Sequence, residues 1–355
     1  MQRRLSGTMV LLLANAGLVG MPAGAADAPA ADAAPWVLVN GRTLGGDALE
    51  LRVEGGRIVD RGATVSREGA RVADAAGGVV LPGFVDSHVH LAYLPAGAEL
   101  ARRGVAAAID LAAPLDQVGR DEPLTVRWSG PMVTAEGGYP TTSWGSGGYG
   151  LPCRDVTTCT ARVDEVVAAG ATVVKVPLDP DPVLSDEALA AVVARAHERG
   201  CKVVAHALSD AGAARAAALG VDALAHVPVE ALSEATVAAY AGRVVIGTLG
   251  AFGGAAEANA ARLHAAGARL LYGTDFGNTR VRGIDGDELV RMARAGMKPA
   301  DVVRAATSEP ATFWGLDGLG SLDVGARAVF VVVPEALDAP EALRQLSAPS
   351  QVLRP

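Results

Sequence analysis

The stretch "LPGFVDSHVH", residues 81–90, begins as an apolar run with strand character and ends in two histidines one residue apart. Side chains two residues apart in a β-strand point to the same side. His88 and His90 therefore face the same way, at the end of a strand. Such a pair can bind a metal ion, or it can be a polar pair buried in a core, and the rest of the chain has to decide between these interpretations.

From residue 79 onward, short apolar runs alternate with alanine-rich helical segments. The predicted strands are 79–89, 105–112, 126–134, 172–177, 202–208, 222–229, 243–249 and 269–276. A helix is predicted over 185–200, where apolar residues recur on one face, acids fill the first turn and Gly200 follows the end. Eight strands with intervening helices over about 240 residues predict an α/β fold, a (β/α)8 or TIM barrel at residues 81–318.

Both ends of the chain predict a small composite β domain, made of residues 35–80 and 319–355. Residues 36–44 and 49–62 have strand character, with hairpin turns expected at Asn40-Gly41 and Gly55-Gly56. The strand pattern returns after the last helices, in "GSLDVGARAVFVVV" at 320–333. We expect this segment to rejoin the N-terminal hairpins.

Residues 1–26 predict a signal peptide. Arg3 and Arg4 precede an apolar run of 14 residues, and Ala23-Gly24-Ala25 follows as a cleavage site. The apolar run is shorter than the ~20 residues that span a bilayer. We therefore expect an exported protein, periplasmic or secreted, without a stable membrane anchor.

Charge and cysteine usage limit the partners. The formal net charge is −8, and no stretch is rich in lysine and arginine, which argues against nucleic acid and anionic membrane surfaces as partners. Cys153 and Cys159 lie in a polar, turn-rich stretch and are expected to form a disulfide, whereas Cys201 is expected to be a buried free thiol. The sequence leaves the oligomeric state open, a homo-oligomer included.

Four of the six histidines end predicted strands. His197 and His264 lie near helix ends and are expected to be surface or packing residues there. The strand-end set consists of His88 and His90 on the first strand, His206 on the fifth, His226 on the sixth and Asp275 on the eighth. From His88 to Asp275 there are 187 residues over seven units, about 27 per unit, a normal length for this fold. The set is thus expected on the active face of the barrel, as ligands for a divalent metal.

Lys175 lies between valines on the predicted fourth strand. Lysine is rarely buried without a partner, and burial lowers its pKa. A neutral buried amine can react with carbon dioxide to form a carbamate, an anionic bidentate group able to bridge two metals. The alternatives are a lysine that reaches the barrel rim or one that pairs with an aspartate.

"PGFVDSHVH", Lys175, His206, "GVDALAHV" and "YGTDF", in that order, resemble the amidohydrolase superfamily. The most similar members are imidazolonepropionase-like hydrolases and prolidase-type metal-dependent dipeptidases, and the resemblance extends over about residues 36–333. It implies two divalent metals, with zinc expected although manganese accepts the same ligands. The implied ligands are His88, His90 and Asp275 on one metal, His206 and His226 on the other, and carbamylated Lys175 as the bridge.

The resemblance also implies a reaction. A bridging hydroxide attacks a carbonyl polarised by the second metal, and Asp275 takes the proton and delivers it to the leaving nitrogen. Asp86, beside the histidine pair, is expected to orient the metal ligands by hydrogen bonds without binding a metal itself. The expected substrate is a small molecule with an amide bond: a dipeptide, an N-acyl amino acid or a lactam.

Three residues are candidates for binding the substrate. Tyr139 replaces a histidine that many relatives have after the strand-3 glycines, and Arg280 and Arg282 follow the eighth strand, where they could bind a free carboxylate. Residues 137–152 are expected to form a mobile loop over the barrel mouth. Within it, "GSGGYG" at 145–150 matches a dinucleotide-binding pattern by letter only, because no helix follows.

Two other functions stay open. A mononuclear deaminase of a heterocycle commonly has a glutamate three residues after the strand-5 histidine, where this chain has Ser209, and it would leave Lys175 without a role. A non-catalytic exported binding protein on the same barrel would have no need of a complete ligand set.

Overall fold

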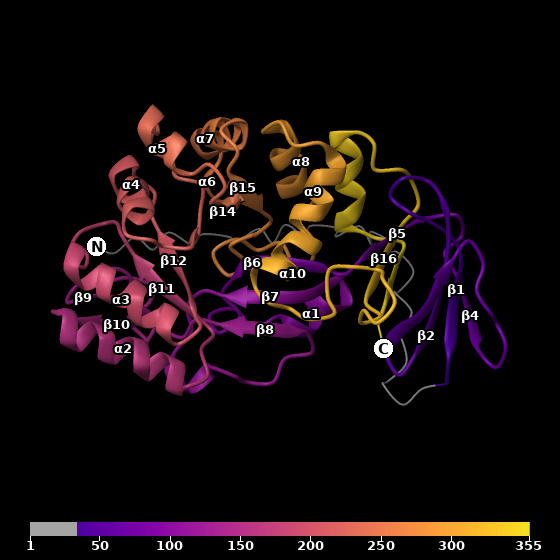
Figure 1. The fold of residues 1–355 in the computed structure, drawn as a ribbon, viewed down its shortest axis with the longest axis horizontal. Helices are drawn as coiled ribbons and strands as arrows, with labels where there is room; N and C mark the ends of the chain where they lie inside the picture. The colour runs from indigo at the N-terminus through magenta and orange to yellow at the C-terminus, as the bar shows by residue number, and fades with distance from the viewer. Residues whose placement is uncertain (1–33, 355) are drawn as a thin grey trace, which may run out of the picture.

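The computed structural model describes residues 34–354, so the predicted signal peptide at 1–26 lies outside the described residues. Within residues 34–354, no helix is both long and apolar enough to cross a membrane. Figure 1 shows an α/β body next to a smaller β-sheet at one end of the molecule.

Eight parallel strands form the centre of the α/β body. Three make one sheet, β6 (Phe84–Val89), β7 (Val105–Asp110) and β8 (Thr125–Trp128), and five make another, β11 (Val173–Pro177), β12 (Lys202–His206), β13 (Ala223–Leu224), β14 (Val244–Ile246) and β15 (Arg269–Leu271). Backbone hydrogen bonds link the two sheets on both sides. Thr172 N–H donates to Trp128 O over 2.9 Å, and Ser87 N–H donates to Tyr272 O over 3.0 Å. The strands therefore follow one another in a TIM-barrel-like arrangement with all carboxyl ends on one side.

Helices cover the outside of these strands (Figure 1). They are α1 (Gly97–Arg102), α2 (Val156–Ala168), α3 (Asp186–Glu198), α4 (Asp210–Ala218), α5 (Glu234–Ala239), α6 (Leu249–Phe252), α7 (Gly254–Ala265), α8 (Gly286–Arg294), α9 (Pro299–Ala305) and α10 (Ser308–Phe313). The helix predicted at 185–200 is α3. It begins where the Ser185 hydroxyl accepts a hydrogen bond from Ala188 N–H, and it buries Leu189, Val192 and Ala196.

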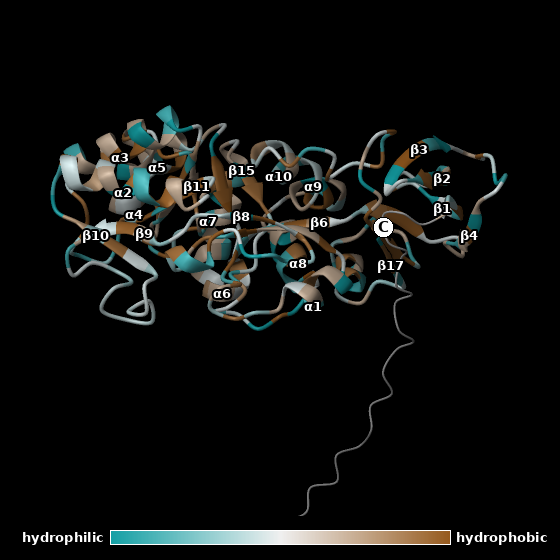
Figure 2. Cartoon of the chain, turned by 90° about the horizontal axis from the view of Figure 1, so that it is seen from below, coloured by the Kyte–Doolittle hydropathy of each residue, from teal (hydrophilic) through white to brown (hydrophobic). Residues whose placement is uncertain are grey.

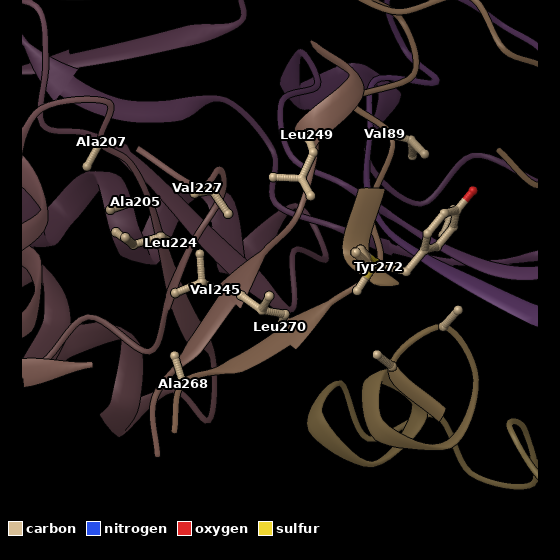
Figure 3. Packing of buried hydrophobic residues seen from close by; sticks show 14 of the residues in the cluster. Val89, Ala205, Ala207, Leu224, Val227, Val245, Leu249, Ala268, Leu270 and Tyr272 are labelled. Atoms are coloured by element: carbon tan, nitrogen blue, oxygen red, sulfur yellow. The ribbon is translucent and has the colours of Figure 1, made fainter. Parts of the chain in front are cut away.

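Alternation along the strands divides the apolar residues between two cores. Leu224, Val245 and Leu270, on successive strands, belong to the outer core under the helices (Figure 3). Their neighbours Ala223, Val244 and Leu271 belong to a second cluster on the opposite side, inside the ring of strands. Because side chains alternate in a strand, any residue in register with the second cluster points into the barrel. This rule decides where Lys175 points.

The small sheet combines both ends of the described chain. Its order is β17 (Gln351–Leu353), β16 (Phe330–Val333), β5 (Val79–Pro82), β1 (Trp36–Arg42), β2 (Ala48–Glu54) and β3 (Arg57–Gly62), with β4 (Arg71–Asp74) also paired to β1. β16 pairs antiparallel with β5, so the C-terminal segment closes onto the N-terminal strands. Figure 2 shows these strands at one end of the molecule. Between β16 and β17, the 3₁₀ helix Pro340–Ser347 returns to α8, where Ser347 Oγ accepts a hydrogen bond from Gly286 N–H.

Several predicted boundaries were wrong; the predicted strands 222–229, 243–249 and 269–276, for example, end at Leu224, Ile246 and Leu271. The predicted strand 79–89 is two strands, because the chain passes from the small sheet to the barrel at Gly83, where a Cβ atom would lie 2.6 Å from Val329. The predicted strand 126–134 is likewise divided into β8 and β9 (Met132–Ala135). Asn40-Gly41 is no hairpin turn: it forms a bulge within β1, with Asn40 in the left-handed region, and the turn follows at 43–47. The predicted turn at Gly55-Gly56 is confirmed.

The segment at 137–152 contains an extra strand. β10 (Gly150–Cys153) pairs with β9, so residues 150–152 are not part of the predicted loop. Cys153 forms a disulfide with Cys159 in α2, as predicted, and Cys201 is a buried free thiol, as predicted. The disulfide fixes the end of the loop segment to the helix that follows it.

Candidate metal centre

His88, His90 and Asp275 form a compact, buried group at the carboxyl ends of β6 and β15. The Nε2 atoms of His88 and His90 are 3.2 Å apart. Oδ1 of Asp275 lies 3.1 Å from Nε2 of His90 and 3.5 Å from Nε2 of His88. One ligand atom from each residue lies within 4.8 Å of the others. Three such atoms so close together form a candidate metal site.

Asp86 holds the two strands of this group together. Its carboxylate accepts hydrogen bonds from His88 N–H at 3.1 Å, from Thr274 N–H at 3.0 Å and from the Thr274 hydroxyl at 2.6 Å. Because Thr274 directly precedes Asp275, Asp86 fixes His88 relative to Asp275. This is the supporting position that the sequence suggested for Asp86.

His206 and His226 bring two further imidazoles to the same place. His206 ends β12 and His226 follows β13. Their ring centroids are 5.0 Å apart, and those of His226 and His88 are 4.6 Å apart. The predicted ligands line one cavity of about 530 Å³: His88, His90, Lys175, His206, His226 and Asp275.

Lys175 is fully buried in this cavity wall. Val173 belongs to the inner cluster, whereas Val174 and Val176 belong to the outer core, so alternation turns Lys175 into the barrel. Burial lowers the pKa of Lys175 to about 7, although the charges of Asp275 and Asp110 oppose this shift. A substantial share of the amine is therefore unprotonated near neutral pH.

The protonation states suit a divalent metal. Nδ1 of His88 lies 2.9 Å from the carbonyl oxygen of Ala225, which can only accept, so Nδ1 carries the proton and Nε2 has the free lone pair. Burial, and next the charge of Lys175, lowers the pKa of His88 well below its usual value, and burial lowers that of His206 to about 4. Burial raises the pKa of Asp275, but His88 and His90 outweigh it and hold that pKa below its usual range. Neutral imidazoles and an ionised carboxylate are the ligands that such a metal requires.

Several contacts of the centre carried little signal in the sequence. Asp179, just after β11, places Oδ1 3.6 Å from Nε2 of His206, while its Oδ2 accepts from Leu208 N–H and Ser209 N–H. The Phe252 ring meets the His226 ring edge-on at 4.8 Å between centroids. Asp179 could have been predicted as a site residue, because it is an acid just after the end of a predicted strand. Nothing in the sequence distinguishes Phe252 from a phenylalanine of the core.

Glu288, a buried carboxyl group on α8, fixes the segment next to His226. It accepts hydrogen bonds from Leu249 N–H at 2.9 Å and Gly250 N–H at 2.7 Å, at the start of α6. The preceding Thr248 places its hydroxyl 3.0 Å from Nδ1 of His226, and α6 ends in Phe252. Glu288 thereby positions two side chains that contact one metal-ligand candidate.

We predict that Glu288 makes folding stability fall as pH rises. Burial raises the pKa of Glu288 from 4.5 to about 8, so between these values the folded chain binds this proton more tightly than the unfolded chain. Stability contributed by the protonated group is therefore lost progressively over this window. Glu288→Gln should flatten the dependence of Tm on pH between about pH 5 and 8 at constant metal content, and exposed Glu335→Gln should not. Identical slopes in Glu288→Gln and the parent protein would refute this assignment.

The predicted substrate-binding residues differ in their positions. Tyr139 lines the cavity and stacks on the His206 ring at 4.8 Å between centroids. Arg280 and Arg282 do not line it: Arg280 donates to the Gly277 carbonyl, and Arg282 pairs with Glu99 over 2.7 Å. Their role as carboxylate ligands stays a prediction.

The segment at 137–152 reaches the mouth of the cavity. Trp144 lines the cavity, donates from Nε1 to the Tyr139 hydroxyl over 2.7 Å and meets the His90 ring at 5.3 Å. Tyr149 contacts Trp144 at 5.3 Å between ring centroids. The position of this segment thus agrees with the predicted loop over the mouth, while its mobility stays a prediction.

The model of the amidohydrolase family matches residues 79–352, most of the chain. The chain belongs to the amidohydrolase family. This confirms the resemblance found in the sequence, and together with the His88, His90 and Asp275 group it makes the protein a metal-binding hydrolase that acts on carbon–nitrogen bonds. A search of curated proteins finds no match.

Solved structures share the fold of this amidohydrolase. A Xaa-Pro dipeptidase with bound methionine in the active site has a TM-score of 0.77 at 18% identity, with 90% of this chain and 100% of that chain covered. Phenylurea hydrolase B has a TM-score of 0.72 at 20% identity, with 90% and 95% covered. Ochratoxinase from A. niger has a TM-score of 0.73 at 20% identity, with 91% and 95% covered. At these identities the likeness establishes the TIM-barrel-like fold and not the substrate.

Proposed function

We propose that this amidohydrolase is an exported enzyme that hydrolyses an amide bond in a small substrate, with two divalent metals, zinc being the expected ion. The observation that carries the proposal is the convergence of four imidazoles, Lys175 and Asp275 on one cavity. In the proposed division, His88, His90 and Asp275 hold one metal and His206 and His226 hold the other. Lys175, as a carbamate, would supply ligand oxygens to both metals.

Burial and orientation support the carbamate. Formation of the N–C bond from the neutral Lys175 amine and carbon dioxide releases one proton and creates an anion. That anion faces the metal site, since Lys175 is turned into the barrel among His88, His206 and Asp275. A mononuclear deaminase would leave this buried lysine without a role, so the binuclear hydrolase is the preferred function.

When bound, the metals would lower the pKa of a water molecule and polarise the scissile carbonyl. The chain's own contribution is proton transfer and positioning. Asp275 is ionised, and its Oδ1 accepts a hydrogen bond from Asn278 Nδ2 over 3.0 Å, which fixes its direction. We assign to Asp275 the acceptance of the proton from the attacking water and its delivery to the leaving nitrogen.

The substrate candidates are dipeptides, N-acyl amino acids and lactams. The test is a library of these compounds, offered to metal-reconstituted protein and read by release of free amine or, for lactams, by ring opening in mass spectrometry. Hydrolysis of at least one class, abolished by chelation and restored by metal, is the expected result. Absence of turnover on every class by protein with two bound metals would refute the proposal.

If Arg280 or Arg282 anchors a substrate carboxylate, its replacement by methionine should lower kcat/KM. The loss of transition-state stabilisation should be on the order of 2–3 kcal/mol, as for a lost charged hydrogen bond. The same change should hardly affect a substrate whose carboxylate is amidated. Folding should change by less than about 1 kcal/mol for Arg282→Met, because its ion pair with Glu99 is at the surface. Equal losses on free-acid and amidated substrates, or none on either, would remove both arginines from the site.

A further inference from the structure

Aromatic side chains are rare in this chain and gather at the mouth of its cavity. The chain has 4 Trp, 5 Tyr and 5 Phe, 14 in total. Of these, Tyr139, Trp144 and Phe252 line the cavity, and Tyr93 and Tyr149 contact Trp144. Five of 14 aromatic residues at one opening is a concentration that the folding of a core does not explain, because the three lining rings are only partly buried.

The three lining rings are held in place. Tyr139 stacks on His206 at an interplanar angle of 23°, and Trp144 is tied to Tyr139 by its indole N–H. Phe252 lies against His226 and ends the helix that Glu288 anchors. Rings fixed by such contacts lose little freedom when a ligand packs between them, which favours binding.

In the part of the chain that the structure describes, the cavity wall around these three rings has no charged side chain. Met132, Leu208 and Ala251 add apolar surface. Among the described residues that line the cavity, the only ones with formal charge are Lys175 and Asp275, both at the metal centre. An anionic substrate group would therefore lose its water beside these rings without gaining a partner.

We propose that Tyr139, Trp144 and Phe252 form a specificity pocket for an uncharged ring, aromatic or alicyclic, attached next to the scissile amide bond. This inference rests on the proposed function and names the substrate class of the same site. It concerns the group beside the metal centre and leaves open a carboxylate at the opposite end of the substrate.

Hydrolysis of matched substrates tests the specificity. N-phenylacetyl and N-cyclohexylacetyl amino acids should be cleaved with kcat/KM at least about tenfold above N-acetyl and N-succinyl forms of the same amino acids. Trp144→Ala should abolish this ratio, and Trp144→Phe, which keeps a ring, should restore most of it. Phe313→Leu is the control, because Phe313 packs against Lys202 at the opposite end of β12.

A binding measurement separates this inference from the proposed function. Benzyl alcohol has no carbon–nitrogen bond, and calorimetry should show it binding the metal-loaded protein at least about tenfold more tightly than 2-methylpropan-1-ol. Trp144→Ala should remove that difference whether or not any amide is cleaved. Equal affinity for the two alcohols would overturn the proposal. So would a Trp144→Ala variant whose kcat/KM falls by the same factor on every substrate. The rings would then serve only to exclude water from the cavity.

Discussion

Lys175→Ala is expected to lose at least one of the two proposed metals and to lower kcat/KM by on the order of 1000-fold, about 4 kcal/mol of transition-state stabilisation. The reason lies in the ligand count. Without the carbamate, His206 and His226 are the only proposed ligands left on one metal, and two imidazoles do not complete a tetrahedral site. Metal analysis of the purified variant and steady-state kinetics measure the two effects separately.

Small carboxylic acids provide a sharper version of the same test. Lys175→Ala leaves a space inside the barrel, and a short carboxylate such as formate, acetate or propionate can place two oxygens where the proposed carbamate would lie. We expect partial recovery of metal content and rate with rising concentration of the acid. Lys202→Ala, on the adjacent strand, should keep its metals and show no such recovery. A Lys175→Ala protein with full metal content and full rate would refute the carbamate.

With both proposed metals bound, Asp275→Asn is expected to lower kcat by on the order of 1000-fold, within the range for loss of a general acid–base group. Asparagine has nearly the same shape but cannot take up the proton that the reaction transfers. KM should change much less, because the rings and neutral groups that line the rest of the cavity are unaffected.

Asn278→Ala is the matched control for Asp275→Asn. It removes the 3.0 Å hydrogen bond to Oδ1 but leaves the carboxylate in place, so the loss in kcat should stay below about tenfold. If Asp275→Asn with both metals bound retained kcat within tenfold of the parent protein, another residue would have to transfer the proton.

The sequence predicted which polar residues gather at the carboxyl side of the barrel strands better than it predicted the first and last residue of each strand. His88, His206 and Asp275 could be placed because the β/α repeat brings every strand end to one face, whatever the loops do. The break at Gly83 could not be predicted, since it depends on the close approach of Val329, which is distant in the sequence. An apolar run does not reveal that its two halves belong to different sheets.

Side chains on loops and short helices were beyond prediction for a similar reason. Phe252 contacts His226 from the end of α6, and Glu288, far along the chain, anchors the start of that helix. Tyr139 was a candidate from its place in the sequence, but its stacking on His206 depends on the path of the loop. The β/α repeat determines where the strand ends lie, whereas contacts between distant parts of the chain determine where Phe252 and Tyr139 lie.

The hydrogen bonds from Thr274 to Asp86 have a consequence for the order of events during synthesis. The histidine pair at 88 and 90 leaves the ribosome 185 residues before Asp275 does. A growing chain thus carries the first ligands for most of its synthesis without the carboxylate that completes their group. Only docking of the last barrel strand, which lets Thr274 reach Asp86, brings that carboxylate to the histidines. Tight metal uptake should therefore be a late event, and its rate after refolding should report on the closing of the barrel between its first and last strands.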